Sequence, residues 1–130
     1  MNILKTKIGI IFPLDDEYNA CKEILGLKNE LELSGRIVLA RKENNVEVHE
    51  IKAGVGKINC NSATQLVIDK LHTDFIIDAG VAGSLAEDVT INDIVCGKHI
   101  FEYDPHTGRE RPYPIHFHLL NNIALTNPFF

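Results

Sequence analysis

The sequence predicts an α/β fold with a mostly parallel mixed sheet and flanking helices. Short runs of β-branched and aliphatic residues alternate along the chain with two segments of helical periodicity. Two of these runs end in glycine-rich turns, at residues 53–57 and 78–83. Small residues at the carboxyl ends of buried strands let the backbone approach a ligand closely, so the turns also indicate a binding site.

The first two expected elements are a buried strand at residues 7–12 and a helix that follows it. Pro13 ends the strand, and three acidic residues at 15–17 suit a first helical turn, where the helix dipole favours negative charge. Gly26 is a plausible stop for the helix. The apolar side of this helix is expected to hold Leu14, Tyr18, Cys21 and Leu25.

A pair of strands is expected next, at residues 36–41 and 46–53, with a turn around Asn44 and Asn45. Residues 57–71 are then predicted to form the second helix. Its apolar side is expected to hold Ala63, Leu66, Val67 and Leu71.

Residues 75–79 are predicted to form a buried strand, and a further strand is expected within residues 91–101. From Glu102 onward, prolines and aromatic residues indicate a loop or lid. A parallel sheet needs both faces covered, and only two convincing helices are available. One face is therefore expected to be bare, which points to a truncated domain or to one completed by a partner.

The composition is that of an ordinary soluble protein with one domain at most: 130 residues, 45% hydrophobic and 24% charged. A net charge of −5 argues against nucleic-acid binding, and no apolar run approaches the ~20 residues that cross a bilayer. The amino terminus lacks the features of a leader peptide, so the cytoplasm is the expected location. Cys21, Cys60 and Cys96 are odd in number and far apart, and are expected to be buried reduced thiols.

Three familiar motifs do not fit. Gly56 and Lys57 lack the preceding glycine of a phosphate-binding Walker loop, and residues 80–83 lack the glycine spacing of a dinucleotide fold. His116 and His118 have no carboxylate or cysteine at metal-ligand spacing and are better explained as a solvated or packed pair. Neither a metal nor a cofactor is therefore expected.

Several segments together resemble the amino-terminal half of 5′-methylthioadenosine/S-adenosylhomocysteine nucleosidases, within the purine nucleoside phosphorylase superfamily. These segments keep the family's order and approximate spacing, which is more specific than any one of them. They lie at residues 7–11, 15–17, 53–57, 78–85 and 92–95. The resemblance implies one nucleosidase-like domain over residues 1–130, recognisable from about 7 to 105, with 106–130 unassigned.

The resemblance implies hydrolysis of the N-glycosidic bond of 5′-methylthioadenosine or S-adenosylhomocysteine, releasing adenine, in methionine salvage. Glu17 would be the base that positions and activates water. Gly83, with Val81 and Ala82, would pass close to the nucleoside, and Val55 would line the ribose and thioalkyl side. An acidic residue at position 17 favours water over phosphate as nucleophile. The family also implies a homodimer.

The chain departs from the family pattern in two ways. Val81 stands where these nucleosidases usually have a serine near the attacking water. The Met-Glu pair that grips the ribose and the Ser-Asp segment that protonates adenine are both absent from the 130 residues, because the only methionine is Met1 and no serine precedes an aspartate. General acid catalysis is typically worth about 10²–10⁴-fold. The chain is therefore expected to be an impaired or inactive nucleosidase.

Alternatives remain open. The position of Glu17 in a first helical turn is also explained if its charge only stabilises the helix dipole. The pair Gly54 and Gly56 is also explained by a tight turn between a strand and a helix. At the level of function, the chain could be a non-catalytic remnant that binds purine nucleosides. It could also be an interaction module that pairs with another chain through an open sheet edge.

Overall fold

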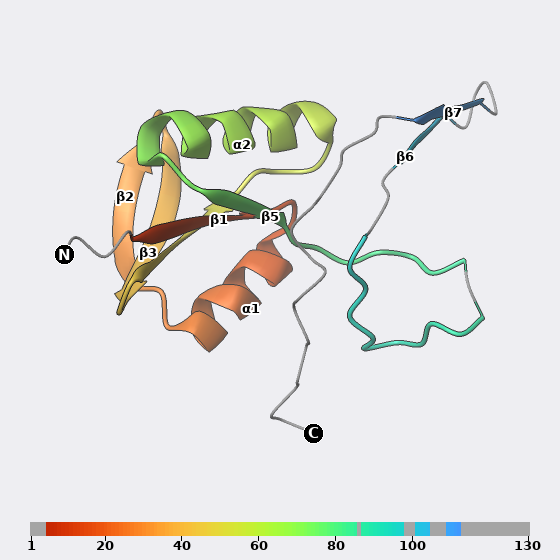
Figure 1. Cartoon of the computed structure of the whole chain (residues 1–130), viewed down its shortest axis with the longest axis horizontal. Coiled ribbons are helices and arrows are strands. Elements are labelled where there is room, and N and C mark those ends of the chain that lie inside the picture. The colour runs from red at the N-terminus through yellow and green to blue at the C-terminus, as the bar shows by residue number, and fades with distance from the viewer. Residues whose placement is uncertain (1–4, 86, 98–100, 105–108, 113–130) are drawn as a thin grey trace. The chain divides into compact units, whose positions relative to one another are not determined.

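The computed structural model describes residues 5–85, 87–97, 101–104 and 109–112. Its contacts divide the chain into two units, Met1–Gly83 and Ser84–Phe130. The elements in chain order are β1 (Thr6–Phe12), α1 (Asp15–Leu25), β2 (Asn29–Leu33), β3 (Arg36–Glu43), β4 (Val46–Lys52), α2 (Lys57–Leu71), β5 (Phe75–Asp78), β6 (Phe101–Asp104) and β7 (Arg109–Pro112) (Figure 1).

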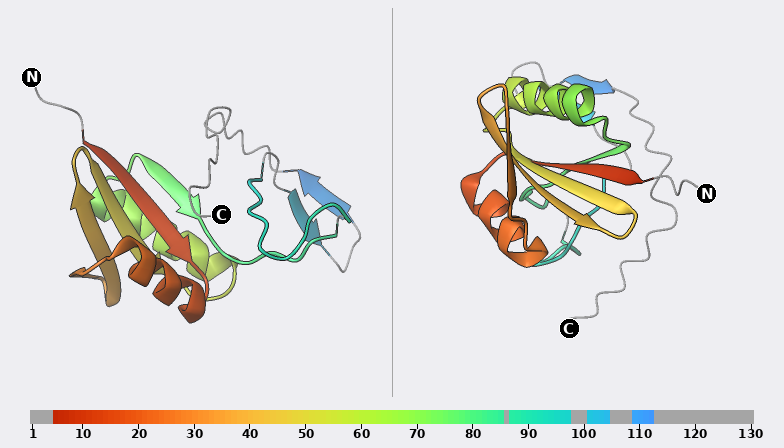
Figure 2. Two further views of the ribbon diagram at one scale, coloured as in Figure 1. Left: turned by 90° about the horizontal axis from the view of Figure 1, so that it is seen from below. Right: turned by 90° about the vertical axis from the view of Figure 1, so that its left-hand side faces the viewer.

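The first unit is a mixed five-stranded sheet in the order β2-β3-β4-β1-β5, with one helix on each face (Figure 2). The central strand β1 runs parallel to both β4 and β5, whereas β2 and β3 are antiparallel to their neighbours. The predicted fold class is confirmed. Neither face of the sheet is bare, however, because α1 packs on β4 and β1 from one side and α2 packs on β1 from the other.

Local sequence explains where the two helices end. α1 ends at Gly26, whose φ of 59° lies in the left-handed region that glycine adopts without strain. α2 covers the predicted range Lys57–Leu71 and ends at His72, also left-handed. The predicted apolar side of α2 is confirmed: Ala63 and Val67 are buried, while Leu66 and Leu71 pack against the core from its margin.

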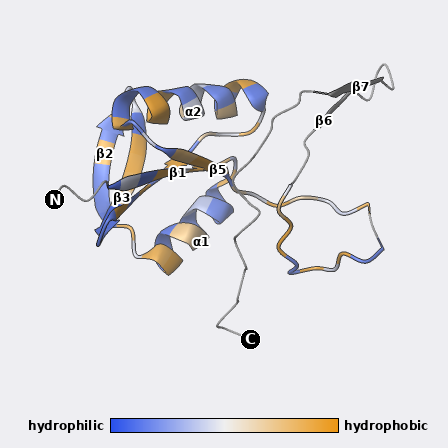
Figure 3. Ribbon diagram, viewed as in Figure 1, coloured by the Kyte–Doolittle hydropathy of each residue, from blue (hydrophilic) through white to orange (hydrophobic). Residues whose placement is uncertain are grey.

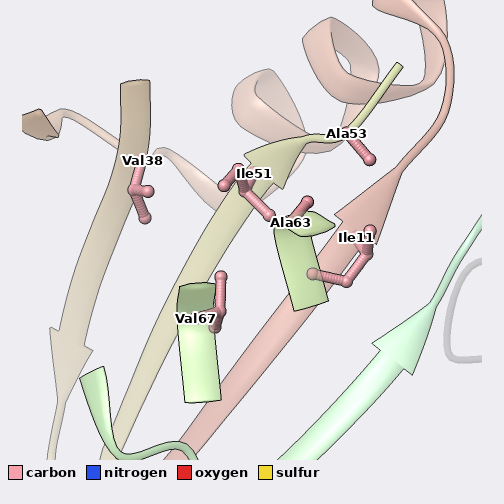
Figure 4. Packing of buried hydrophobic residues seen from close by; sticks show 6 residues of the cluster. All are labelled: Ile11, Val38, Ile51, Ala53, Ala63 and Val67. Carbon is pink, nitrogen blue, oxygen red and sulfur yellow. The ribbon is translucent and has the colours of Figure 1, made fainter. Parts of the chain in front are cut away.

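The hydrophobic core lies between the sheet and α2. Its buried members are Ile11, Val38, Ile51, Ala53, Ala63 and Val67 (Figure 4). Side chains alternate along a strand, so the residues on either side of Ile51 face α1 instead. Among the described residues, neither helix is long and apolar enough to cross a membrane.

Several predicted details are wrong. The strand β2 was not expected, because Asn29–Leu33 carries charged residues and is largely exposed. The strand expected within residues 91–101 is absent from residues 91–97, while residues 98–100 lie outside the described part of the chain; the next described strand is β6, which begins at Phe101. β6 pairs with β7 as an antiparallel hairpin in the second unit, where a loop or lid was expected. Residues 113–130, including His116 and His118, lie outside the described residues.

The cysteines are unpaired, as expected, but they are not fully buried. Cys21 and Cys60 are half-buried, and Cys96 is exposed. Burial raises the pKa of the Cys21 thiol to about 11, and the nearby negative charge of Glu50 adds to this effect.

Candidate functional site

The carboxyl ends of β4, β1 and β5 lie side by side at one edge of the sheet. The register places Phe12 beside Lys52 and Ile11 beside Asp78. Hydrogen bonds extend this alignment past the strands, from Ala53 N to Phe12 O (2.7 Å) and from Ala79 N to Ile11 O (3.0 Å). Three loops therefore leave the sheet from adjacent positions, in the arrangement that commonly forms ligand sites in open α/β sheets.

Glu17 connects two of these loops. It is the third residue of α1, so it lies in the turn that follows β1 directly. Its Oε2 accepts a hydrogen bond from Leu14 N (3.1 Å), and its Oε1 accepts one from Val81 N (2.8 Å). A carboxylate has about four acceptor positions, so these two bonds orient Glu17 and leave capacity for a further donor such as water.

The segment after β5 forms a backbone shelf, residues 80–83, beside this carboxylate. A Cβ atom added at Gly80 would lie 3.2 Å from Glu17 Oε1 and 3.3 Å from Pro13 Cδ, so the absence of a side chain lets the two loops approach closely. Val81, Ala82 and Gly83 continue from this contact and are exposed, with Val81 82% exposed. The structure thus brings Glu17 and the start of the shelf together.

Val55 lies apart from this contact, on the loop between β4 and α2, and its side chain is 68% exposed. Gly54 and Gly56 on either side of it have φ angles of 88° and 99°, which side-chain-bearing residues rarely adopt. The carbonyl of Val55 accepts a hydrogen bond from Asn59 Nδ2 (2.8 Å) in the first turn of α2. Its backbone is therefore fixed while its side chain stays accessible.

Two basic residues that were not predicted hold these loops in place. Arg36 Nη1, at the start of β3, donates to Ala53 O (2.8 Å) and so supports the loop that carries Val55. Lys52 at the end of β4 forms an ion pair with Asp15 (2.6 Å) in the first turn of α1. No sequence motif marks either contact, because each depends on the pairing of β3, β4 and β1. Within the described residues, no cluster of histidine, cysteine and acidic side chains is arranged to hold a metal.

The close contact at Gly80 makes a testable prediction. Gly80→Ala would press a methyl group against Glu17 and Pro13, so either the carboxylate or the ring must shift. We expect this variant to lose about 1–2 kcal/mol of unfolding free energy. Gly83→Ala is the matched control, because a Cβ there meets nothing within 4 Å and neither glycine has a positive φ. Urea unfolding of both variants measures the difference, and equal stabilities would contradict the close contact.

A carboxylate and an exposed backbone shelf lie at the ends of the parallel strands, which is where open α/β sheets commonly bind small molecules. Comparison with known families points the same way: the profile of the phosphorylase superfamily matches residues 7–127. This chain therefore belongs to the phosphorylase superfamily.

Its curated relatives include many 5′-methylthioadenosine/S-adenosylhomocysteine nucleosidases, which confirms the resemblance seen in the sequence. The nucleosidase of Staphylococcus epidermidis is 32% identical over 97 residues, which are 75% of this chain and 42% of that protein. The nucleosidase of Buchnera aphidicola is 35% identical over 98 residues, again 75% of this chain and 42% of the relative. The chain thus spans less than half the length of these relatives.

Solved structures with a similar fold include two enzymes of Helicobacter pylori. A nucleosidase mutant with 5′-methylthioadenosine in its active site has a TM-score of 0.63 and 28% identity, over 69% of this chain and 39% of that one. The futalosine hydrolase has a TM-score of 0.70 and 27% identity, over 76% of this chain and 43% of that one. Both neighbours are named for hydrolytic or nucleosidase activity.

Proposed function

We propose that this chain carries the water-activating part of an N-glycoside hydrolase site for 5′-methylthioadenosine and S-adenosylhomocysteine. The observation that supports this most is the pair of hydrogen bonds that fix the Glu17 carboxylate between Leu14 N and Val81 N. A base held at a ligand-accessible shelf is what positioning of a nucleophilic water requires. The relatives, named as nucleosidases for these substrates, support the same substrate class.

In the proposed reaction, Glu17 accepts a proton from water while the water oxygen bonds to C1′ of the ribose. The bond between C1′ and the adenine nitrogen breaks, and the electron pair leaves with the base. Val81, Ala82 and Gly83 lie along the nucleoside, and Val55 faces its ribose and thioalkyl side. A nearby carboxylate also stabilises the positive charge that develops on the sugar.

The departing adenine needs a proton, and no Ser-Asp segment is present in the 130 residues to supply it. We propose that the chain by itself binds purine nucleosides and releases adenine slowly. Homodimer formation and a part in methionine salvage, which the resemblance implies, belong to the same proposal, as does the cytoplasmic location expected from the sequence.

Adenine release from 5′-methylthioadenosine, followed by chromatography, tests this proposal. We expect the chain to bind the nucleoside in a calorimeter and to release adenine at least about 10²-fold more slowly than the Staphylococcus epidermidis nucleosidase, because the leaving-group acid is missing. A rate equal to that of the relative would contradict the need for the acid. Failure to bind the nucleoside would contradict the site itself.

A further inference from the structure

The loop that leads from β4 into α2, residues 53–56, combines a flexible kind of backbone with one accessible apolar side chain. Gly54 and Gly56 both have positive φ angles, and glycine loses more conformational freedom on ordering than any other residue. Val55 between them is 68% exposed. Figure 3 shows the connection into α2 in colours from white to orange, which mark neutral to hydrophobic residues. A loop of this composition keeps one shape only when other groups hold its backbone.

Arg36 holds the first half of this loop. The antiparallel pairing of β3 with β4 ends at Val38 and Ile51. The carbonyls of Lys52 and Ala53 lie just past that pair and accept hydrogen bonds from Arg36 Nη1, at 3.3 Å and 2.8 Å. The guanidinium therefore continues the attachment of the loop to β3 where the backbone pairing stops.

Asn59 holds the second half of the loop from the other side. It lies in the first turn of α2, and its Nδ2 donates a hydrogen bond to Val55 O (2.8 Å). The same amide lies close to Gly54, where an added Cβ atom would be 3.5 Å from Nδ2. Side-chain donors thus bind the carbonyls on both sides of Gly54, so the loop backbone is ordered before any ligand binds.

Under the proposed function, Val55 faces the ribose and thioalkyl side of the nucleoside. A fixed apolar side chain there favours a 5′-methylthio group over a 5′-hydroxyl group, because the hydroxyl would lose its hydrogen bonds to water. One methylene more or less in an apolar pocket is worth about 10–200-fold in discrimination. A mobile loop would lose part of this effect, since it can withdraw from the hydroxyl and must be ordered again to cover the methylthio group.

We propose that Arg36 and Asn59 are positioning residues that set the preference of this site for an apolar 5′ substituent, by holding the loop that carries Val55. This role rests on the proposed function, since it concerns recognition of the same nucleoside. Neither residue contacts the nucleoside, and each acts only through the loop carbonyls that it binds.

Calorimetric titration of the full 130-residue chain with 5′-methylthioadenosine and with adenosine tests this role. We expect the wild type to bind 5′-methylthioadenosine about tenfold more tightly than adenosine, the lower end of the range for such a difference. Arg36→Met and Asn59→Ala should each reduce this ratio about fivefold, because the loop must then be ordered when the ligand binds. The affinity for adenosine should stay near that of the wild type.

Two control variants each remove a similar donor that does not bind the loop. Arg41, also on β3, donates to Leu25 O at the end of α1, so Arg41→Met removes an arginine from the same strand. Gln65, also in α2, donates to Asp69, so Gln65→Ala removes an amide from the same helix. Both controls should keep the wild-type ratio of affinities.

The possible results distinguish failure of this role from failure of the proposed function. If the wild type binds neither nucleoside, the proposed function is wrong and this role falls with it. If the wild type binds both, three results overturn the role alone: no preference for 5′-methylthioadenosine, an unchanged ratio in Arg36→Met and Asn59→Ala, or a parallel loss of affinity for both nucleosides. Circular dichroism shows which variants are folded. Asn59→Ala decides the matter if Arg36→Met does not fold, because Asn59 is exposed and alanine favours the helix.

Discussion

Replacing Glu17 with glutamine is expected to reduce adenine release from 5′-methylthioadenosine by about 10²–10⁴-fold, the usual range for loss of a general base. The amide keeps the length of the side chain but cannot accept a proton from water. Initial rates over long incubations, with the uncatalysed rate subtracted, measure the effect. An unchanged rate would remove Glu17 from the mechanism.

Asp16→Asn is the matched control for this variant. Asp16 is the neighbouring acid in the same helical turn, and it is exposed. Both substitutions remove one negative charge from the amino end of α1, so a simple dipole effect would be similar for the two. Only the base role predicts that Glu17→Gln loses adenine release while Asp16→Asn keeps it. Equal losses would favour the dipole interpretation.

Glu17→Gln should also loosen the loop contact, and this part of the prediction can be separated from catalysis. Glutamine has one acceptor oxygen, so one of the bonds from Leu14 N and Val81 N must be lost. A charge-assisted hydrogen bond is worth roughly 1.5–3 kcal/mol. We expect a lower melting temperature with near-unchanged nucleoside binding, as seen by calorimetry.

The sequence predicted the elements that bury side chains in a regular pattern. The range Lys57–Leu71 matched α2, because Ala63 and Val67 recur at helical spacing against the core. β2 was missed because its residues are mostly exposed and several are charged. Its strand conformation depends on hydrogen-bonded pairing with β3 and not on burial of its side chains. The same reason explains the hairpin of β6 and β7, whose pairing no local pattern revealed.

The residues of the candidate site also fall into two groups: some have a local sequence signal, and others are brought together only by the fold. Glu17 and the small residues near Gly80 were visible, because an acidic helix start and a glycine-rich turn are local features. The hydrogen bond from Val81 N to Glu17 was not, since it joins residues 64 positions apart. Arg36 was invisible for a similar reason: its role depends on the antiparallel pairing that brings β3 to the loop after β4.

Glu50 was not singled out by the sequence, yet its burial gives the stability of the protein a dependence on pH. It lies on β4 facing α1 and is 0% exposed. Neither of its carboxylate oxygens has a hydrogen-bond partner among the described residues. Burial raises its pKa from 4.5 to about 7, and the neighbouring Cys21 thiol and then the charge of Lys22 oppose the rise. The folded protein therefore binds this proton more tightly than the unfolded chain does.

This difference should make the protein less stable as the pH rises. Below pH 4.5 the carboxyl is protonated in both states, and its contribution is fully present. Between pH 4.5 and about 7 the unfolded chain ionises first, so the unfolding free energy falls by about 3 kcal/mol. Above pH 7 both states are ionised and the decline from this group ends. Urea unfolding at a series of pH values measures the slope.

Glu50→Leu should remove that slope and stabilise the protein by about 1–3 kcal/mol at pH 8, because an apolar side chain then replaces an unpaired buried charge. Glu47, on the same strand, supplies the contrast. Burial alone would raise its pKa, but ion pairs with Lys5 (2.7 Å) and Lys42 (3.2 Å) outweigh burial and lower its pKa to about 2. The contribution of ionised Glu47 to the free energy of unfolding is present above pH 4.5 and is lost as the pH falls toward 2.

Glu47→Gln should therefore destabilise the protein at neutral pH and leave the contribution of Glu50 between pH 4.5 and 7 in place. Two carboxylates three residues apart on β4 would then act in opposite directions on stability. The reason is that Glu47 forms ion pairs with Lys5 and Lys42, whereas Glu50 forms no ion pair within the described part of the chain. Parallel stability curves for the wild type and Glu50→Leu across pH 4.5 to 7 would show that Glu50 is ionised in the folded state at low pH. In that case an unidentified polar partner must hold its charge beneath α1.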